Sequence, residues 1–291
     1  MLIRLAPIVF VCLWATGFVG ARFAMPYAEP ASFLTSRYLL ALIVLAAICL
    51  IAKAPWPKGW SAIHAMVIGL LVHGVYLGGV FWAVRNGMPG GIAAIIVGLQ
   101  PLLTAWLASI WLKDEISRWH WIGIAMGLVG ISLVLLPGFD FTSSGINAIT
   151  TSACLISVVG MTLGTLMQKR YVIDTADLRT NTALQYVGAL APTILFAMAF
   201  EDFQIEWNTD TVFALFWLVL VLSIFAIFLL MWLIRQGSVA QVSSLFYLVP
   251  AVAALMTWIL FDEALTPIQI IGMVICTIAV ALASKKPKVA A

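Results

Sequence analysis

The sequence predicts an all-α integral membrane protein whose ten transmembrane helices form two inverted repeats of five helices each. The composition gives the first indication: hydrophobic residues make up 64% of the chain, charged residues only 9%, and the mean hydropathy is +1.11. Soluble domains carry about 25% charged residues. Two further indications are apolar runs long enough to cross a bilayer and a set of landmark residues that occurs twice.

Ten apolar runs of about 20 residues, the length that crosses a hydrocarbon core of about 30 Å, follow one another along the chain. We expect them at 5–24, 31–52, 63–84, 91–112, 119–136, 148–168, 180–200, 211–234, 240–260 and 267–284. The first run is too long for a signal peptide, contains Trp14 and Arg22, and lacks a small-residue cleavage site, so it is expected to be a helix. The short loops leave no room for a soluble catalytic or nucleic-acid-binding domain.

A series of landmarks occurs in the same order in both halves of the chain, offset by 148 to 150 residues. The series in the first half is Trp82, Arg85, Gly87, Pro101, Asp114-Glu115 and Gly123. Its counterpart in the second half is Trp232, Arg235, Gly237, Pro250, Asp262-Glu263 and Gly272. Arg37-Tyr38 likewise falls opposite Gln185-Tyr186. We therefore expect a duplicated unit, with repeats over 1–140 and 141–291 that together form one transport domain.

Five helices per repeat is an odd number, so the second repeat must enter the membrane from the opposite face. Inverted repeats place two similar bundles around a site near the bilayer midplane, and rocking of one against the other exposes that site alternately to each side. With the amino terminus inside, twelve of the fifteen basic residues fall on the inner side. The positive-inside rule then predicts that both termini are cytoplasmic.

The chain resembles the drug/metabolite transporter superfamily, in particular its EamA-type exporters. The resemblance is carried by the ten spans in two halves, the short basic amino terminus, the motif W-A-T-G-F at Trp14–Phe18, and the helix-Pro-helix-acidic-pair-Gly unit in each half. Among EamA-type proteins it is most similar to bacterial amino-acid exporters, including exporters of aromatic amino acids. The resemblance implies efflux of small metabolites across the bacterial cytoplasmic membrane.

Arg37 and Tyr38 lie about two turns below the outer surface in the second span. An intramembrane arginine normally snorkels, pairs, or faces water. Either Arg37 snorkels outward, or it faces the outer vestibule, where it would meet a substrate carboxylate. Gln185 and Tyr186 are candidate binding residues because they mirror Arg37 and Tyr38.

His73 and Tyr76 lie near the middle of the third span, three residues apart, which puts them on one face of a regular α-helix. A polar pair at this depth faces protein or water rather than lipid. Two interpretations remain open: the pair lines a cavity wall, or it forms a buried hydrogen bond between helices.

Pro101 and Pro250 stand at mirrored positions in the middle of the fourth and ninth spans. Because proline removes a backbone donor and kinks a helix, we expect the two residues to act as paired hinges. Candidates for the cavity lining beside them are Gln100, Ser244 and Tyr247. Trp14, deeper than an interfacial tryptophan, either lines the cavity or packs in the core.

The acidic pairs Asp114-Glu115 and Asp262-Glu263 are expected to cap the fifth and tenth helices. All twelve acids fall in loops or at span ends, whereas proton-driven pumps usually carry Asp or Glu within the membrane. Facilitated movement down the substrate gradient is therefore favoured, with His73 as the deep group that could carry a proton.

The leading hypothesis is an alternating-access exporter of amino acids, aromatic ones included, or of related small metabolites. The alternatives are a drug carrier or a nucleotide-sugar or nucleoside carrier of the same superfamily, and more remotely an intramembrane enzyme. No hydrolase motif or paired intramembrane aspartates occur in the sequence, so we expect no enzyme. We expect no cofactor, no metal site and no nucleic acid; the partners are a small-molecule substrate and the lipid bilayer. One chain contains both repeats, so a working monomer is compatible with this mechanism.

Overall fold

The computed structural model describes residues 2–24, 26–88, 93, 96–136, 147–172, 177–261 and 265–283. This part of the chain is helical apart from loops and one isolated bridge between Ala28 and Ile205. Its helices form ten transmembrane segments in two halves of five, which confirms the predicted fold class. Six helical stretches are long and apolar enough to cross a membrane by themselves, and three shorter apolar helices accompany them.

The five segments of the first half have the following bounds: α1 (Leu2–Ala24), α2 (Pro30–Ile51), α3–η1–α4 (Trp60–Gly69, Leu70–Leu77, Gly78–Arg85), α6 (Gln100–Trp111) and α7 (Arg118–Leu135). Those of the second half are α8–η3 (Ala148–Met167, Gln168–Val172), α9 (Leu178–Phe200), α10–η4–α11 (Thr209–Trp217, Leu218–Ala226, Ile227–Gln236), α12–η5–α13 (Val239–Ser244, Leu245–Leu248, Val249–Phe261) and α14 (Pro267–Ala283).

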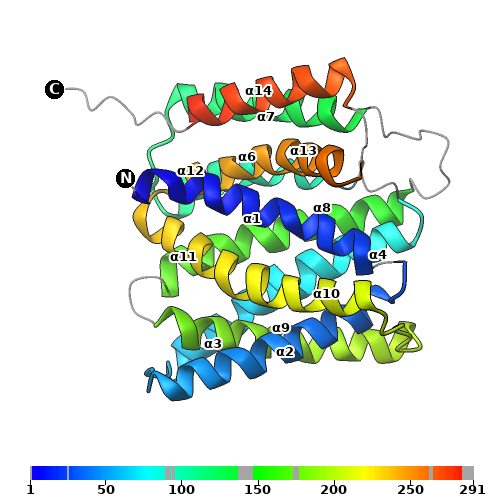
Figure 1. The fold of residues 1–291 in the computed structure, drawn as a ribbon. Coiled ribbons are helices and arrows are strands. Elements are labelled where there is room, and N and C mark those ends of the chain that lie inside the picture. Colours follow the sequence, from blue (N-terminus) through cyan, green and yellow to red (C-terminus); the bar gives the residue numbers. More distant parts are fainter. Residues whose placement is uncertain are drawn as a thin grey trace.

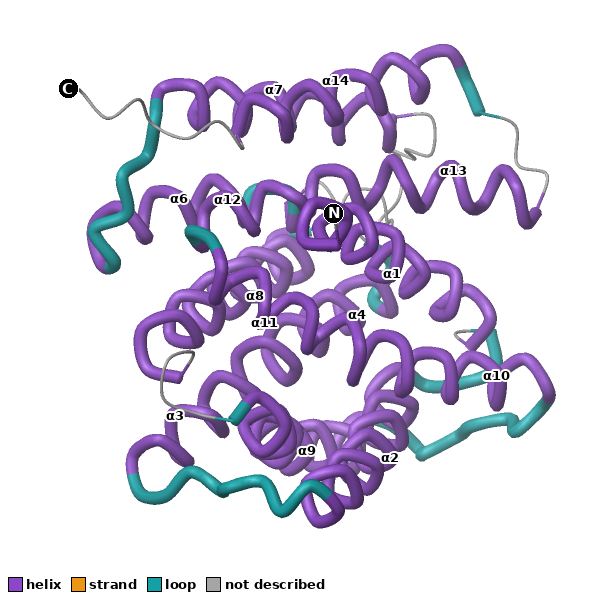
Figure 2. The backbone as a smooth tube through the Cα atoms, turned by 60° about the vertical axis from the view of Figure 1, so that its left-hand side comes forward, coloured by secondary structure: helices purple, strands orange, loops and turns teal. Residues whose placement is uncertain are grey.

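The helices run side by side, and the start of α1 and the end of α14 lie at the same end of the bundle (Figure 1). We call this end the termini side and the other end the opposite side. The helices α7 and α14 form a pair along one edge, α2, α3 and α9 lie along the other, and the remaining helices fill the space between (Figures 1 and 2).

The third and eighth segments each contain a π-helix at mirrored positions. The first, η1, covers Leu70–Leu77, and the second, η4, covers Leu218–Ala226. Hydrogen bonds in a π-helix run to the fifth residue along, so the side chains follow a wider turn than in an α-helix. Because the two stretches share no obvious sequence motif, their matching position comes from the duplicated architecture.

The fourth and ninth segments are interrupted just before their prolines. A turn at Gly98 and Leu99 precedes α6, which carries Pro101 in its first turn. The 3₁₀-turn η5 leads into α13, which carries Pro250 near its start. A proline ring clashes with the carbonyl four residues earlier, so loss of regular α-helix over those residues is the expected consequence.

Small residues allow α7 and α14 to pack closely along their length. A Cβ added at Gly130 would lie 3.0 Å from the carbonyl oxygen of Gly272, and one added at Gly123 would lie 2.6 Å from that of Ala279. Gly123 and Gly272 are repeat mates, so these contacts are related by the internal symmetry. Close approach through glycine is typical of membrane helices.

The expected capping role of Asp114-Glu115 is wrong. Helix α7 begins at Arg118, and the side chain of Ser117 accepts the hydrogen bond from the backbone N–H of His120. Ser117 lies at the N-cap, whereas Asp114 and Glu115 precede it by three and two residues and do not supply the cap hydrogen bond. Asp262 and Glu263 lie outside the described residues.

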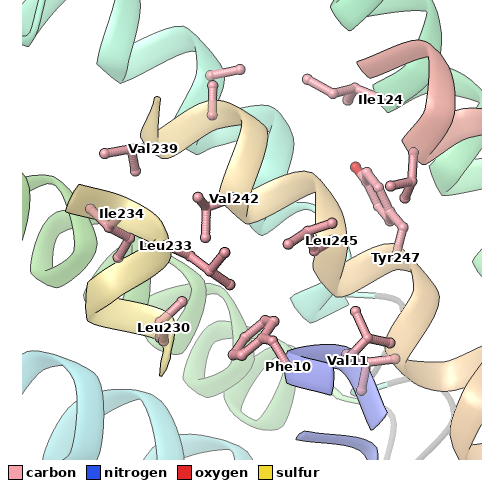
Figure 3. Close-up of a cluster of buried hydrophobic side chains, with 14 of the residues drawn as sticks. Phe10, Val11, Ile124, Leu230, Leu233, Ile234, Val239, Val242, Leu245 and Tyr247 are labelled. Carbon is pink, nitrogen blue, oxygen red and sulfur yellow. The ribbon is translucent and has the colours of Figure 1, made fainter. Parts of the chain in front are cut away.

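A core cluster on the termini side joins the two halves. Its buried members on α1, α11 and α12 are Phe10, Val11, Leu230, Leu233, Ile234, Val239 and Val242 (Figure 3). These side chains are apolar, so the three helices are held together here by hydrophobic contact. The cluster therefore fixes the first helix against the second repeat.

Candidate functional site

Five residues from four transmembrane segments meet in the interior and form what we call the central cluster. They are Arg37, Tyr38, His73, Tyr186 and Ser223. The tyrosines, the histidine and the serine are all at most 4% exposed, and Arg37 is half-buried. The cluster contains both tyrosines of the mirrored pair Tyr38 and Tyr186, whose ring centroids lie 5.5 Å apart.

Each of these tyrosines donates a hydrogen bond to a carbonyl of the π-helix in its own repeat. The hydroxyl of Tyr38 donates to the carbonyl oxygen of His73 at 3.0 Å, and that of Tyr186 donates to the carbonyl oxygen of Ser223 at 2.9 Å. Since Ser223 is the repeat mate of His73, the two bonds are equivalent. The internal symmetry thus extends to single hydrogen bonds at the centre of the molecule.

The side chains of His73 and Arg37 cross between the repeats. The imidazole of His73 stacks on the Tyr186 ring, with centroids 4.6 Å apart and 21° between the planes. The Nε of Arg37 donates to the Ser223 hydroxyl at 2.9 Å. The cluster therefore joins the first repeat to the second by aromatic contact and by hydrogen bonding.

Arg37 and His73 both retain unused hydrogen-bonding capacity. Within the described part of the chain, Arg37 forms no ion pair, and its hydrogen-bond partner is a neutral hydroxyl. The Nε2 atom of His73 is buried and has no partner there. A guanidinium carries five N–H donors in a planar fork that matches a carboxylate. The geometry is thus suited to an incoming acceptor with negative charge.

The structure does not place His73 and Tyr76 on the common face that regular α-helical spacing predicts. His73 is buried in the central cluster, whereas Tyr76 is half-buried and packs against the cluster formed by Ile68, Val72 and Met161. Both residues lie in η1, where the wider π-helical turn rotates residues three apart onto different faces. The spacing rule of a regular α-helix therefore does not give the relative orientation of these two side chains.

Gln185 points away from its neighbour Tyr186 and into a second buried polar group. Its amide nitrogen donates to the side-chain oxygen of Gln168 at 2.7 Å. The amide of Gln168 in turn lies 3.2 Å from the sulfur of Met231, and Asn181 and Thr182 also approach this sulfur. Gln185 therefore mirrors Arg37 in sequence but belongs to a neutral amide group.

The other predicted site residues lie outside the central cluster. The amide of Gln100 donates to Thr104, and the hydroxyl of Ser244 donates to the Gln241 carbonyl, each within its own segment. Tyr247 is buried against Gly127, with its ring directed toward Ile124 (Figure 3).

Trp14 packs in an aromatic group with Phe10 and Phe246, at centroid distances of 5.3 Å to each. Pro101 is buried at the start of α6. The side chain of Pro250 lies outside the described residues.

Two acids at the opposite side form a hydrogen-bonded network. One carboxylate oxygen of Glu29 pairs with Arg85 at 3.0 Å, and the other accepts the backbone N–H groups of Asp202 and Gln204. Burial raises the pKa of Glu29, but these backbone bonds and Arg85 outweigh it and hold the pKa below its ordinary value. Glu201 accepts hydrogen bonds from the backbone N–H groups of Ala31 and Ser32, at the start of α2.

The counterpart of Glu29 on the termini side is bonded differently. Asp177, 148 residues further along, precedes α9 as Glu29 precedes α2. Its carboxylate binds Arg179 of the same turn, at 2.6 Å and 2.9 Å, and the hydrogen bonds from Arg179 lower the pKa of Asp177. The repeat mate of Arg85 is Arg235, so the two sides differ in how the mirrored acids are held.

Comparison with known proteins identifies the family. The EamA-like transporter family matches the chain twice, over residues 3–136 and again over residues 149–285. This chain belongs to the EamA-like transporter family. The match agrees with the expected membership of the drug/metabolite transporter superfamily.

Relatives of this EamA-like protein occur in bacteria and plants. The inner membrane transporter YedA of Escherichia coli K12 is 28% identical over 93% of this chain and 86% of its own length. The protein PecM of Dickeya dadantii is 25% identical over 90% and 86%. A WAT1-related chloroplastic protein of Arabidopsis thaliana is 23% identical over 92% of this chain and 66% of its own.

The fold of the EamA-like chain is also found in solved structures. One crystal structure superposes with a TM-score of 0.78 over 97% of this chain and 96% of its own, at 18% identity. This likeness shows the fold alone. Membership of the EamA-like family makes the chain a multi-pass membrane transporter, and its central cluster lies where the two EamA repeats meet.

Sequence reasoning missed three residues of this EamA-like interior. Ser223, the repeat mate of His73, supplies both a hydroxyl to Arg37 and a carbonyl to Tyr186. Asn181 and Met231 join Gln185 in the buried amide group. The offset of about 150 residues marks Ser223 in the sequence, whereas nothing local distinguishes Met231 from an ordinary core methionine.

Proposed function

We propose that the protein is an alternating-access transporter that exports amino acids, aromatic ones included, or related small metabolites with a carboxylate. The proposal places both termini in the cytoplasm of a bacterial cell and the repeat boundary at 140/141. The observation that carries it is the position of Arg37: an interior cation at the junction of the repeats, paired with a hydroxyl and with no carboxylate among the described residues. An intramembrane charge of this kind is costly, and such charges typically mark the pathway of a substrate or ion.

The aromatic side chains of the central cluster support an amino-acid substrate. A carboxylate bound by Arg37 would place the rest of the substrate next to Tyr38, Tyr186 and the His73 imidazole. Aromatic rings favour offset or edge contacts with other rings, which add about 0.5–1.5 kcal/mol beyond the burial of area. The cluster therefore suits a substrate that combines a carboxylate with an aromatic group.

The mirrored acids Glu29 and Asp177 suggest how the two sides could open in turn, by exchanging their arginine partners. In the state described here the opposite side is held by Glu29 and Arg85. In the other state, we propose, Asp177 exchanges Arg179 for Arg235, its counterpart of Arg85, while the Glu29–Arg85 pair opens. The helix interruptions before Pro101 and Pro250 are the proposed hinges for this exchange.

The positions of the Asp and Glu residues support facilitated transport of the substrate. All twelve Asp and Glu residues lie outside the middle of the predicted spans, so no carboxylate is available there to carry a proton across. His73, buried near the middle of its span, has an ordinary pKa near physiological pH. The proposal is that substrate moves down its own gradient without an obligatory proton.

A ligand series tests the role of the carboxylate. Labelled phenylalanine uptake into proteoliposomes would be competed with unlabelled phenylalanine, phenylalaninamide and phenylethylamine, which differ only at the carboxylate. Phenylalanine should compete well and the two analogues poorly. Equal competition by all three would contradict the proposal, and uptake of nucleosides or cationic drugs in place of amino acids would favour the alternative substrate classes.

A further inference from the structure

A groove of about 580 Å³ opens between the start of α9 and the eighth transmembrane segment, at the termini side. We call it the α9–α11 groove. Asp177, Arg179 and Arg235 line its polar end, where α9 begins and α11 ends. Phe225, Phe228 and Trp232 line the part that extends along the helix. The groove thus combines a charged end at the helix termini with an apolar length toward the membrane interior.

The apolar part of the groove lies on the outward-facing side of the eighth segment. Phe225 is 56% exposed, and the same segment also exposes Phe213, Phe216 and Leu220. In a transmembrane helix such an exposed apolar face meets lipid chains. An acyl chain can therefore enter the groove directly from the bilayer, whereas an aqueous solute would have to displace lipid to reach Phe225.

The polar end of the groove is lined by charged side chains. Its described lining contains two arginines and one aspartate, and the aspartate is held by Arg179 through two side-chain N–H groups. A guanidinium has five N–H donors, so Arg179 keeps donors for a further acceptor. Its side chain is 37% exposed and thus accessible. Arginine favours phosphate because its planar fork matches the phosphate oxygens.

We propose that the α9–α11 groove binds an anionic phospholipid of the leaflet on the termini side. The phosphate lies between Arg179 and Arg235, and one acyl chain lies along Phe225, Phe228 and Trp232. The depth is consistent, because both arginines stand at the ends of transmembrane helices, where headgroups lie. Basic pockets between transmembrane helices are a general means of holding anionic headgroups.

Lipid titration of the purified full-length protein tests this site. Delipidated protein in a neutral detergent would be titrated with dioleoyl-phosphatidylglycerol or dioleoyl-phosphatidylcholine, with bound lipid counted by native mass spectrometry and the thermal midpoint recorded. The anionic lipid should bind as a discrete first molecule and raise the midpoint more than the zwitterionic one. Arg235→Gln should weaken that first binding about fivefold, the effect of losing about 1 kcal/mol.

Lys58→Gln is the matched control, because Lys58 is an exposed cation in the loop before α3, outside the groove lining. It should leave the first binding event unchanged. Equal weakening by both substitutions would overturn the site in favour of diffuse charge attraction. The same stabilisation by glycerol 3-phosphate would overturn it in favour of an aqueous anion site, and equal effects of the two lipids would overturn it as well.

A second variant keeps the test independent of the arginine. Leu229→Trp fills the apolar part of the groove and leaves both arginines in place. If Arg235→Gln does not fold, this variant should still lose the discrete lipid while the protein elutes as a single species. Retention of the lipid by Leu229→Trp would contradict the proposed path of the acyl chain.

Discussion

Arg37 is the residue on which the proposed chemistry depends. Arg37→Gln places the amide of its own repeat mate, Gln185, in the central cluster and removes the positive charge. Hydrogen bonds to charged groups contribute about 1.5–3 kcal/mol, so the KM for a carboxylate substrate should rise roughly 10- to 100-fold. Uptake kinetics in proteoliposomes measure this change.

Arg37→Lys keeps the charge but loses the planar fork, and it should retain part of the activity. An unchanged KM in Arg37→Gln, in protein that is folded and inserted, would show that Arg37 only snorkels.

The mirrored tyrosines support the two π-helices. Tyr38→Phe or Tyr186→Phe removes the side-chain hydrogen bond to the buried carbonyl of His73 or Ser223. A hydrogen bond of this kind contributes about 0.5–1.5 kcal/mol, so each variant should unfold at a lower temperature. Thermal denaturation of the purified protein measures the loss. Tyr27→Phe, at a 36% exposed position on the opposite side, is the control and should change little. Equal effects of the three substitutions would contradict the structural role of the two bonds.

At the residue scale, the sequence predicted part of the central cluster. The 148-residue offset correctly marked Tyr38 and Tyr186 as a related pair, because repeat symmetry places mates around one axis. Gln100, Ser244 and Tyr247, predicted from their places beside the two prolines, lie outside this cluster, with side chains that turn to partners in their own segment or into the core. Side-chain direction depends on local helix irregularities that the landmark pattern does not contain.

At the scale of elements, the crossing of α3 and α9 depends on glycine. A Cβ at Gly69 would overlap the backbone of Gln185, and one at Gly188 would overlap the backbone of Met66. Backbone atoms cannot move aside as side-chain ends do, so Gly69→Ala should destabilise the protein by about 1–3 kcal/mol or more. Gly78→Ala is the matched control, since nothing lies within 4 Å of a Cβ there. Similar thermal midpoints for the two variants would contradict this packing.

The contact between Glu29 and Arg85 should depend on pH. The pKa of Glu29 lies below its ordinary 4.5, so its contribution to stability is fully present above pH 4.5 and is lost as the pH falls through the lower, folded-state value. The difference in thermal midpoint between wild type and Glu29→Gln should therefore be constant near neutral pH and disappear under acid. Asp202→Asn removes a nearby exposed carboxylate and should not reproduce this profile. A difference that persists in strong acid would contradict the assignment.

Element boundaries were predicted unevenly. The spans of α2, α9 and α14 follow from continuous apolar runs with clear ends. The π-helices could not be predicted from the sequence, because an i→i+5 turn is stabilised by tertiary contacts, such as the hydrogen bond from the Tyr38 hydroxyl, rather than by local composition. The start of α7 at Arg118 lies within one residue of the predicted span, but Ser117 rather than the acidic pair caps it, because its side chain stands directly before the helix.

At the scale of the whole molecule, two inverted repeats of one family domain meet at a cluster that both share. Number and order of the spans were predictable because membrane helices must be apolar over a fixed length. The asymmetry between the two ends of the molecule was not predictable from the sequence. Glu29 and Asp177 occupy equivalent positions in the two repeats but bind different partners.

The most direct test of the central claim is counterflow in proteoliposomes that contain only this protein. Vesicles loaded with unlabelled phenylalanine and diluted into a trace of labelled phenylalanine should accumulate label transiently, with no pH gradient imposed. Accumulation of this kind requires a site that faces one side at a time and needs no proton. Absence of counterflow, with uptake appearing only under a pH gradient, would contradict facilitated alternating access.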